Sequence, residues 1–360
     1  MFRWMTVCCT AVVVLAAGLS QVRAQPRDAT LAVVMTNDAT ANQIKVYDAG
    51  TSKLLQTLST QGQGAAGGNA RGVRQLDGEM VAAVNNGSNS VAVFRRTGKG
   101  LHFERLVTTT SAPVSIDFGN GHMYVAGETT VDSFVLHHDS VGSRDGSVTL
   151  ELAGGGVPPS GATAQVGVAD DRHLLVTIKT DPTPGTVDVV GLDDDGAISG
   201  AAATAVSAPA GTLTPFGFSV YPDGSAVITL AHTNQLGLFR DSAFRTVVTP
   251  GQAAPCWTTR VGKYVFTANT ASRTITRVVG TGSNVFTDSA IAASIATGGA
   301  PSDIDAAAGV LGVIDHGAGQ SHLSLFSYNA FGELAASGAP ITVGVPNANG
   351  VAIVPAKERP

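Results

Sequence analysis

A repeated unit of short strands constrains the fold of this chain more than any other sequence feature. Its clearest copy runs from Gly251 to Ile275: a loop with Gly and Pro, a short run from Cys256, a tight turn, and the apolar run Tyr264-Val265-Phe266. Short runs of β-formers separated by Gly, Asn and Ser turns are typical of an antiparallel meander. One sheet of three or four strands cannot bury both of its faces, so the unit requires neighbours of its own kind.

Copies of this unit recur roughly every 40–50 residues, the spacing expected of propeller blades. The paired strands at the centres of the seven copies begin at Leu31, Met80, His122, His173, Ala226, Tyr264 and Val310. Several copies are preceded by a short strand that follows a proline. At the start of a strand, the missing N–H of proline removes no hydrogen bond from the sheet. These prolines are Pro113, Pro215, Pro255 and Pro301.

The first copy lacks its innermost strand, and Asn349 to Val354 at the other end of the chain resembles the missing piece. An open ring would leave edge strands and an uncovered blade face. We therefore predict an all-β fold, a seven-bladed β-propeller in which the C-terminal strand completes the first blade. Ser289 to Ala296 is the one plausible helix, and its β-branched content and repeat position favour an outer strand or loop.

The N-terminus has the features of a secretory signal peptide. Arg3 supplies a positive charge, Val7 to Gly18 is apolar, and Val22-Arg23-Ala24 fits a small-residue cleavage site. We expect residues 1–24 to be the signal and residues 25–360 to form a single propeller domain, periplasmic or secreted. The alternative is a retained N-terminal anchor. Cleavage would remove Cys8 and Cys9, leaving Cys256 without a partner for an internal disulfide.

The charge pattern excludes some partners. The net charge is −5, charged residues make up 14% of the chain, and no basic stripe is present. Nucleic acid and anionic membrane surfaces are therefore not expected partners. We expect a monomer without cofactor, metal or membrane insertion after signal cleavage. Its partner would be a small molecule or an exported protein or glycan.

The blade sequences resemble the lactonase family of seven-bladed propellers, which includes 6-phosphogluconolactonase-like and carboxymuconate cyclase-like enzymes. The resemblance is carried by Thr214-Pro215-Phe216-Gly217-Phe218, by Gly251 to Trp257, and by the YVTN-like run Tyr264 to Asn269. It covers Leu31 to Val354 and implies the seven-bladed fold.

The resemblance also implies a site of His, Arg and Glu at one end of the central channel. The family's His would fall at Thr163-Ala164-Gln165, one arginine at Phe216, the Glu near Ala231-His232, and a second arginine near Ser302. This chain has none of these residue types there, apart from His232 in place of a carboxylate. Cations to hold an anionic substrate and a base beside them are then missing.

Candidate ligand-binding residues can still be named at the mouth of the channel. Cys256 and Trp257 could line it, or form a buried structural pair. Arg71 is the best remaining anion-binding candidate, although a structural role is the simpler interpretation. The full set of lining residues that we expect is Arg71, Gln165, Phe216, Cys256, Trp257, His232 and Asn349.

Two functions of different class remain. The first is a propeller that binds a small ligand or partner at the channel mouth without the family's catalytic set, and the sequence favours this one. The alternative is a lactonase or cyclase-like enzyme acting on a small carboxylated lactone. Fold likeness alone supports the alternative, and fold does not specify function.

Overall fold

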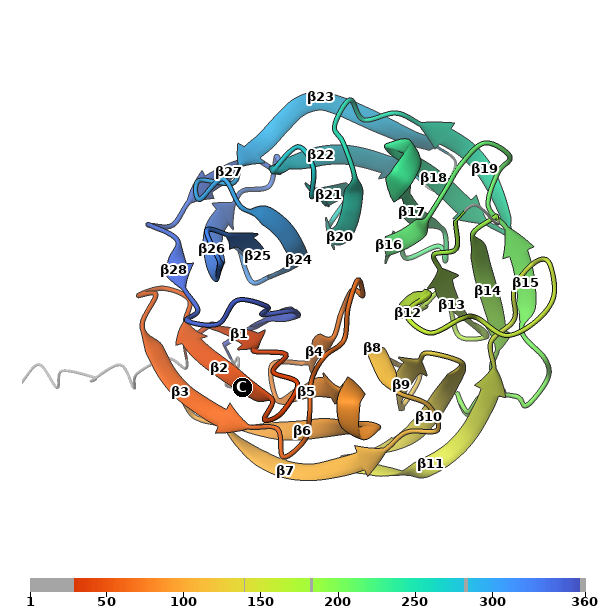
Figure 1. Cartoon of the computed structure of the whole chain (residues 1–360), viewed down its shortest axis with the longest axis horizontal. Coiled ribbons are helices and arrows are strands. Elements are labelled where there is room, and N and C mark those ends of the chain that lie inside the picture. The colour runs from red at the N-terminus through yellow and green to blue at the C-terminus, as the bar shows by residue number, and fades with distance from the viewer. Residues whose placement is uncertain (1–28, 139, 182–183, 282–283, 357–360) are drawn as a thin grey trace, which may run out of the picture.

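The computed structural model describes residues 29–138, 140–181, 184–281 and 284–356. These residues form seven antiparallel sheets arranged as a ring around a central channel (Figure 1). The predicted seven-bladed propeller is therefore confirmed. The expected signal, residues 1–24, lies outside the described residues.

The strands of each blade follow here in order from the channel outwards. Blade 1 is β29 (Val351–Val354), β1 (Leu31–Met35), β2 (Gln43–Asp48) and β3 (Leu54–Ser59); blade 2 is β4 (Val73–Leu76), β5 (Met80–Asn85), β6 (Ser90–Thr97) and β7 (Gly100–Thr108); blade 3 is β8 (Pro113–Gly119), β9 (His122–Gly127), β10 (Thr130–His137) and β11 (Ser140–Thr149); blade 4 is β12 (Thr163–Val168), β13 (His173–Ile178), β14 (Thr186–Gly191) and β15 (Thr204–Ser207). Blade 5 is β16 (Pro215–Val220), β17 (Ala226–Leu230), β18 (Gln235–Arg240) and β19 (Ala243–Val248); blade 6 is β20 (Pro255–Val261), β21 (Tyr264–Asn269), β22 (Thr274–Thr281) and β23 (Asn284–Ser294); blade 7 is β24 (Ala300–Ala307), β25 (Val310–Gly317), β26 (Gln320–Tyr328) and β27 (Leu334–Ala336), with β28 (Ile341–Thr342) also paired to β26.

The ring closes as predicted. Strand β29 pairs antiparallel with β1, with Val351 opposite Val34 and Val354 opposite Leu31. Since β29 comes from the C-terminus and β1 to β3 from the N-terminus, blade 1 joins the two ends of the chain. The segment Ser289 to Ala296 lies largely in β23, an outermost strand, as expected.

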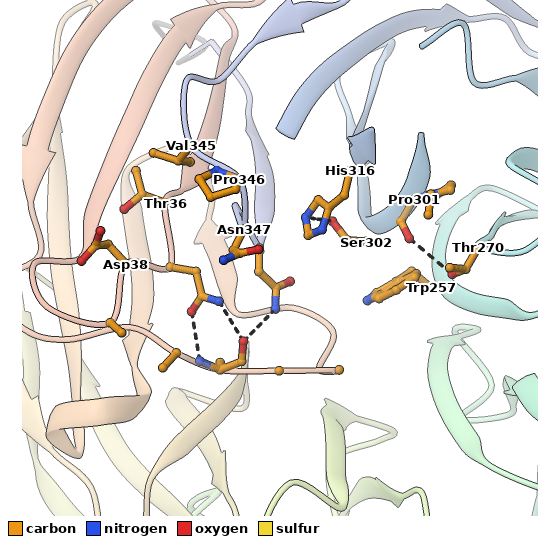
Figure 2. Close-up of a pocket in the computed structure, with 18 of the residues that line it drawn as sticks. Thr36, Asp38, Trp257, Thr270, Pro301, Ser302, His316, Val345, Pro346 and Asn347 are labelled. Carbon is orange, nitrogen blue, oxygen red and sulfur yellow. Dashed lines mark hydrogen bonds between the residues drawn. The ribbon is translucent and has the colours of Figure 1, made fainter. Parts of the chain in front are cut away.

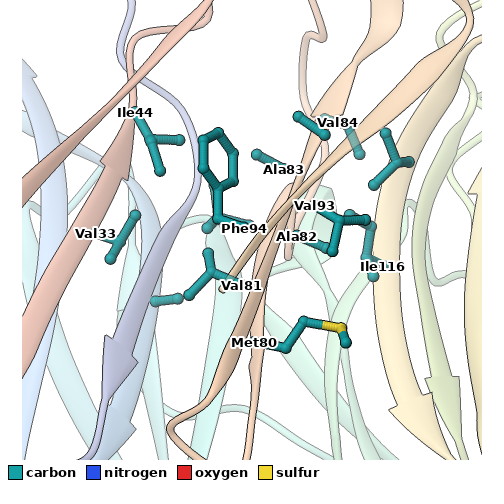
Figure 3. Packing of buried hydrophobic residues seen from close by; sticks show 14 of the residues in the cluster. Val33, Ile44, Met80, Val81, Ala82, Ala83, Val84, Val93, Phe94 and Ile116 are labelled. Carbon is teal, nitrogen blue, oxygen red and sulfur yellow. The ribbon is translucent and has the colours of Figure 1, made fainter. Parts of the chain in front are cut away.

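The middle strands of each blade are largely unbroken apolar runs, because both faces of these strands are buried. All six residues of β5 are buried. Figure 3 shows Val81 and Phe94 facing Ile44 of blade 1, while Ala82 and Val93 lie on the side of Ile116 in blade 3. Alternate side chains of one strand point to opposite faces of the sheet, so each blade packs against both of its neighbours.

The innermost strands expose one backbone edge to the channel, and polar side chains of the preceding blade satisfy part of it. Asp303 accepts a hydrogen bond from the N–H of Val351 at 3.1 Å, and Asp305 accepts one from Ile353 at 2.8 Å. Asp117 accepts one from the N–H of Val168 at 3.0 Å in the same way. Buried backbone donors need such partners, which explains the polar residues of these strands.

Two local features follow from chain geometry. Asn120 and Gly121 both have positive φ, 48° and 72°, as the tight hairpin turn between β8 and β9 requires. Gly217 lies on the crowded strand β16, where an added Cβ would come within 2.4 Å of the Cys256 carbonyl oxygen. Across the described ranges, no helix has both the length and the apolar character needed to cross a membrane.

Candidate functional site

A loop between β3 and β4 crosses the channel at one end of the ring. This channel-crossing loop, residues 60–72, includes a glycine-rich segment and reaches the middle of the ring in Figure 1. Its Asn69 carbonyl accepts a hydrogen bond from Trp257 Nε1 of blade 6 at 2.9 Å. The N–H of Ala70 donates to the carbonyl of Ala164 in blade 4 at 3.0 Å. The loop therefore ties together blades on opposite sides of the channel.

Two side chains at the start of blade 1 anchor the same loop. Asn37 holds Ala66 through both of its amide atoms, at 2.8 and 3.0 Å. Asn349 donates from Nδ2 to Asn69 Oδ1 at 2.6 Å. Gly68 adopts a φ of 56°, and an added Cβ there would approach Lys179 Cε at 3.1 Å. Glycine thus lets the loop lie against Lys179.

A pocket of about 740 Å³ lies between this loop and blades 1, 6 and 7. The lining side chains are mostly small or polar: Thr36, Asn37, Asp38, Thr40, Trp257, Thr270, Pro301, Ser302, His316, Pro346, Asn347 and Asn349. Figure 2 shows Thr36 and Asp38 on one side, Trp257 and Thr270 on the other, and His316 with Ser302 between them. The volume falls within the ~300–1,000 Å³ typical of small-molecule sites.

Asp38 is the one carboxylate among the described residues that line the pocket. The hydrogen bond from the Thr40 hydroxyl, followed by those from the N–H groups of Ala41 and Thr40, holds the pKa of Asp38 below its usual range. Asp38 is therefore ionised at neutral pH. Among the described residues that line the pocket, none is Lys or Arg. An anionic ligand would meet a negative charge here and no cation to offset it.

Ser302 and His316 form a contact that suggests nucleophilic chemistry at first sight. Ser302 Oγ lies 3.0 Å from His316 Nε2, and the same Nε2 lies 2.7 Å from the carbonyl oxygen of Ala348 (Figure 2). A carbonyl oxygen can only accept, so Nε2 must carry the proton. That nitrogen then cannot take a proton from Ser302, as a general base for a serine nucleophile must.

Arg71 belongs to a cluster of buried and partly buried charges. It contacts Asp117 at 3.4 Å and donates to the carbonyl of Phe218 at 3.3 Å. Burial, together with the charge of Arg74, lowers the pKa of Arg71 to about 10, so it stays charged at pH 7. Arg74 in turn bridges Asp117 at 2.9 Å and Asp305 at 3.5 Å. Arg71 is paired within the protein and does not line the pocket.

Gln165 and Phe216 are part of the framework beneath the mouth. Gln165 is fully buried, and its amide pairs with both the N–H and the C=O of Phe218, at 3.0 and 2.8 Å. Phe216 packs edge-to-face on Trp257 at 5.3 Å, with Lys179 Nζ 5.6 Å from its ring centre. Both residues fix neighbouring strands and the indole.

Cys256 and His232 also lie outside the pocket lining. Burial raises the pKa of the Cys256 thiol to about 11, so it is not a thiolate at neutral pH. His232 is exposed and its Nδ1 contacts Asp181. Over the described part of the chain, no group of three or more His, Cys, Asp or Glu side chains is arranged to hold a metal ion.

Of the seven predicted residues, the structure brings Trp257 and Asn349 to the pocket wall. Sequence reasoning missed the channel-crossing loop and Asp38, and assigned Ser302 and His316 no place in a common site. The channel-crossing loop contains the glycine-rich run Gly62 to Gly68. Its position between β3, an outermost strand, and β4, the innermost strand of the next blade, was the available signal, because this connection runs in towards the channel.

Comparisons with known proteins bear on the fold. No known protein family and no curated protein matches the sequence. Solved structures do match: a "putative 6-phosphogluconolactonase" from Bacteroides fragilis has a TM-score of 0.62 and 13% identity, covering 91% of this chain and 99% of that one. A second protein of that description, from Bacteroides uniformis, has a TM-score of 0.63 and 15% identity, covering 90% and 99%.

Another similar structure is virginiamycin B lyase from Staphylococcus aureus, solved with quinupristin. Its TM-score is 0.55 at 15% identity, covering 80% of this chain and 93% of the lyase. Identities this low establish a common fold and leave the chemistry open. The chain therefore shares its propeller fold with the two Bacteroides proteins.

Proposed function

We propose that this protein is a binding propeller, which holds a small ligand in the pocket at the channel mouth without catalysing its conversion. The observation that carries the proposal is the pocket itself: about 740 Å³, lined by small apolar residues together with hydroxyl, amide and indole groups, and without a lining Lys or Arg among the described residues. Concave sites of this size, mostly apolar with a few polar groups, are where small ligands bind.

The chemistry of the pocket supports binding over hydrolysis. A lactonase needs a base for water or a nucleophile, and a donor for the developing oxyanion. His316 Nε2 is committed to the Ala348 carbonyl, and the Cys256 thiol is protonated and outside the lining. Asp38 lines the pocket, but hydrogen bonds from Thr40 and Ala41 lower its pKa and so make its carboxylate a weak base. A carboxylated or phosphorylated lactone would also lack a cation partner in this pocket.

Lactone hydrolysis is the test that separates binding from catalysis. We expect the protein to hydrolyse gluconolactone and 6-phosphogluconolactone no faster than buffer, as followed by proton release in a pH-stat. The contact between Ser302 and His316 favours the lactonase alternative. Hydrolysis that is lost in Ser302→Ala and kept in Ser327→Ala, an exposed serine of β26, would overturn the proposal.

Export is part of this proposal, and the sequence of residues 1–24 supports it. In a bacterial host we expect the chain in the periplasm or medium, beginning at Gln25. Intact-mass measurement of the exported protein tests this, and a retained Met1 would contradict it.

A further inference from the structure

An acceptor without a donor lies in the wall of the pocket. Asn349 directs Nδ2 at two acceptors, Asn69 Oδ1 at 2.6 Å and the Ala66 carbonyl at 3.5 Å, which determines the orientation of its amide. Its Oδ1 is buried and has no hydrogen-bond partner among the described residues. A buried acceptor of this kind is costly, and a ligand donor would remove the cost.

Two hydroxyl groups of the pocket wall already donate hydrogen bonds to other protein atoms. Thr40 Oγ1 donates to Asp38 Oδ1 at 2.7 Å, and Thr270 Oγ1 donates to the Pro301 carbonyl at 3.3 Å. A hydroxyl that has given its proton away retains lone pairs. These oxygens can therefore accept hydrogen bonds from a ligand, as Asn349 Oδ1 can.

The indole supplies an apolar surface of fixed orientation. Trp257 lines the pocket, while its Nε1 donates to Asn69 and its ring packs on Phe216. Because its N–H is already used, Trp257 can offer the ligand only ring carbon. A ring-shaped ligand with C–H groups on one face suits such a surface.

Charge decides between the classes of donor-rich ligand. Anions are disfavoured because no Lys or Arg stands among the described residues of the lining. A cationic amine would need a carboxylate shielded from water or an open Trp, Tyr or Phe face. Asp38 is exposed to solvent, and its Oδ1 accepts three hydrogen bonds, from the Thr40 N–H, the Thr40 hydroxyl and the Ala41 N–H. Trp257 is the one Trp, Tyr or Phe of the described lining, and it is largely buried.

We infer that the pocket takes a neutral polyhydroxylated ring, a sugar in its cyclic form, with Asn349 Oδ1 accepting a hydrogen bond from one of its hydroxyl groups. The inference rests on the proposed binding function and goes further by naming the ligand class and a residue that selects it.

The fluorescence of Trp257 provides a direct assay. The chain has two tryptophans, Trp4 and Trp257, so full-length protein carrying Trp4→Phe reports on the pocket alone. The probes are methyl glucoside, methyl galactoside and cellobiose, against gluconate, 6-phosphogluconate and glucosamine as charged counterparts. We expect saturable changes in Trp257 emission with at least one neutral probe and none with the charged ones.

Asn69→Ala is the matched control for Asn349→Ala. Both variants lose the bond between the two side chains, and only Asn349→Ala removes the unpartnered oxygen. We expect Asn349→Ala to weaken binding of the neutral probe about tenfold, the equivalent of one hydrogen bond, and Asn69→Ala to weaken it less than threefold. Circular dichroism and thermal unfolding would verify that both variants are folded.

The outcomes distinguish failure of the proposed binding function from failure of the sugar ligand class. Binding of charged probes alone would leave the binding function standing and overturn the sugar class. Equal weakening in the two variants would overturn the role of Asn349 Oδ1. No response to any probe, in fluorescence or in thermal shift, would count against the binding function as well.

Discussion

Asp132 and Asp188 occupy the same position in consecutive blades, but their carboxylates have different surroundings. Both are buried third residues of their strands, β10 and β14. Asp132 accepts bonds from the Thr110 N–H, the Thr110 hydroxyl and the Ser147 hydroxyl, at 2.6 to 2.7 Å. Asp188 accepts one from the Glu151 N–H at 2.8 Å, and its Oδ1 has no partner among the described residues.

The pKa of Asp188 makes stability depend on pH. Burial raises this pKa from 3.8 to about 7. The folded protein then holds a proton that the unfolded chain releases, so this group's contribution to stability falls as the pH rises from about 4 to about 7. Asp188→Asn is neutral and keeps an oxygen for Glu151. At pH 8 we expect it to raise the free energy of unfolding by ~1–3 kcal/mol, measured in denaturant, and to have little effect at pH 4.

The control for this prediction is Asp132→Asn. Its amide would turn an N–H₂ group towards donors that now bond the carboxylate, so we expect ~1–3 kcal/mol of destabilisation at pH 8. If the two substitutions destabilised the protein equally at pH 8, the raised pKa of Asp188 would be ruled out.

At the scale of single elements, β29 is a short strand with a large structural role. Its four residues are buried and pair with β1 along their whole length. The N–H groups of Val351 and Ile353 point to Asp303 and Asp305 of blade 7. By the alternation of a strand, the N–H of Ala352 between them faces β1.

Proline at position 352 tests whether β29 closes the ring. Ala352→Pro removes the ladder bond towards β1 and puts a ring in a fully buried site. We expect the free energy of unfolding to fall by ~3 kcal/mol or more, seen as a lower denaturation midpoint. The matched variant Ala356→Pro lies just beyond the strand and should leave the midpoint unchanged. Equal stability of the two proteins would argue against closure by β29.

For the whole molecule, the ion pairs of Arg74 connect three blades, one of which is not a neighbour of the other two. Arg74 belongs to blade 2 and contacts Asp305 in blade 7 as well as Asp117 in blade 3. With Arg71, it compensates carboxylates that also hold the inner backbone edges. Paired charges thus join the innermost strands of blades 2, 3 and 7.

Arg74→Met should destabilise the entire ring. It leaves Asp117 and Asp305 with less compensation in a buried setting, which typically costs ~3–5 kcal/mol. Arg172→Met breaks the exposed ion pair with Asp194, in which the side chains are 60% and 85% exposed, and should have no measurable effect. Calorimetric unfolding compares the two variants, and an Arg74→Met protein as stable as Arg172→Met would contradict this assignment.

The sequence alone determined the number of blades and the closure of the ring. Those features depend on local alternation, on turn residues such as Asn120 and Gly121, and on an apolar segment, Val351 to Val354, that needs a partner. Short-range physics specifies each strand, and seven similar units have few ways to bury their faces.

Only the tertiary structure decided the binding pocket. Asn69 meets Trp257 and Asn349 across 188 and 280 positions of the sequence. No periodicity encodes such contacts, since they depend on where a glycine-rich loop runs once the ring has closed. Of the predicted residues, Trp257 and Asn349 line the pocket. Arg71 and Gln165 instead bind Asp117 and Phe218, which lie close to them only in the folded ring.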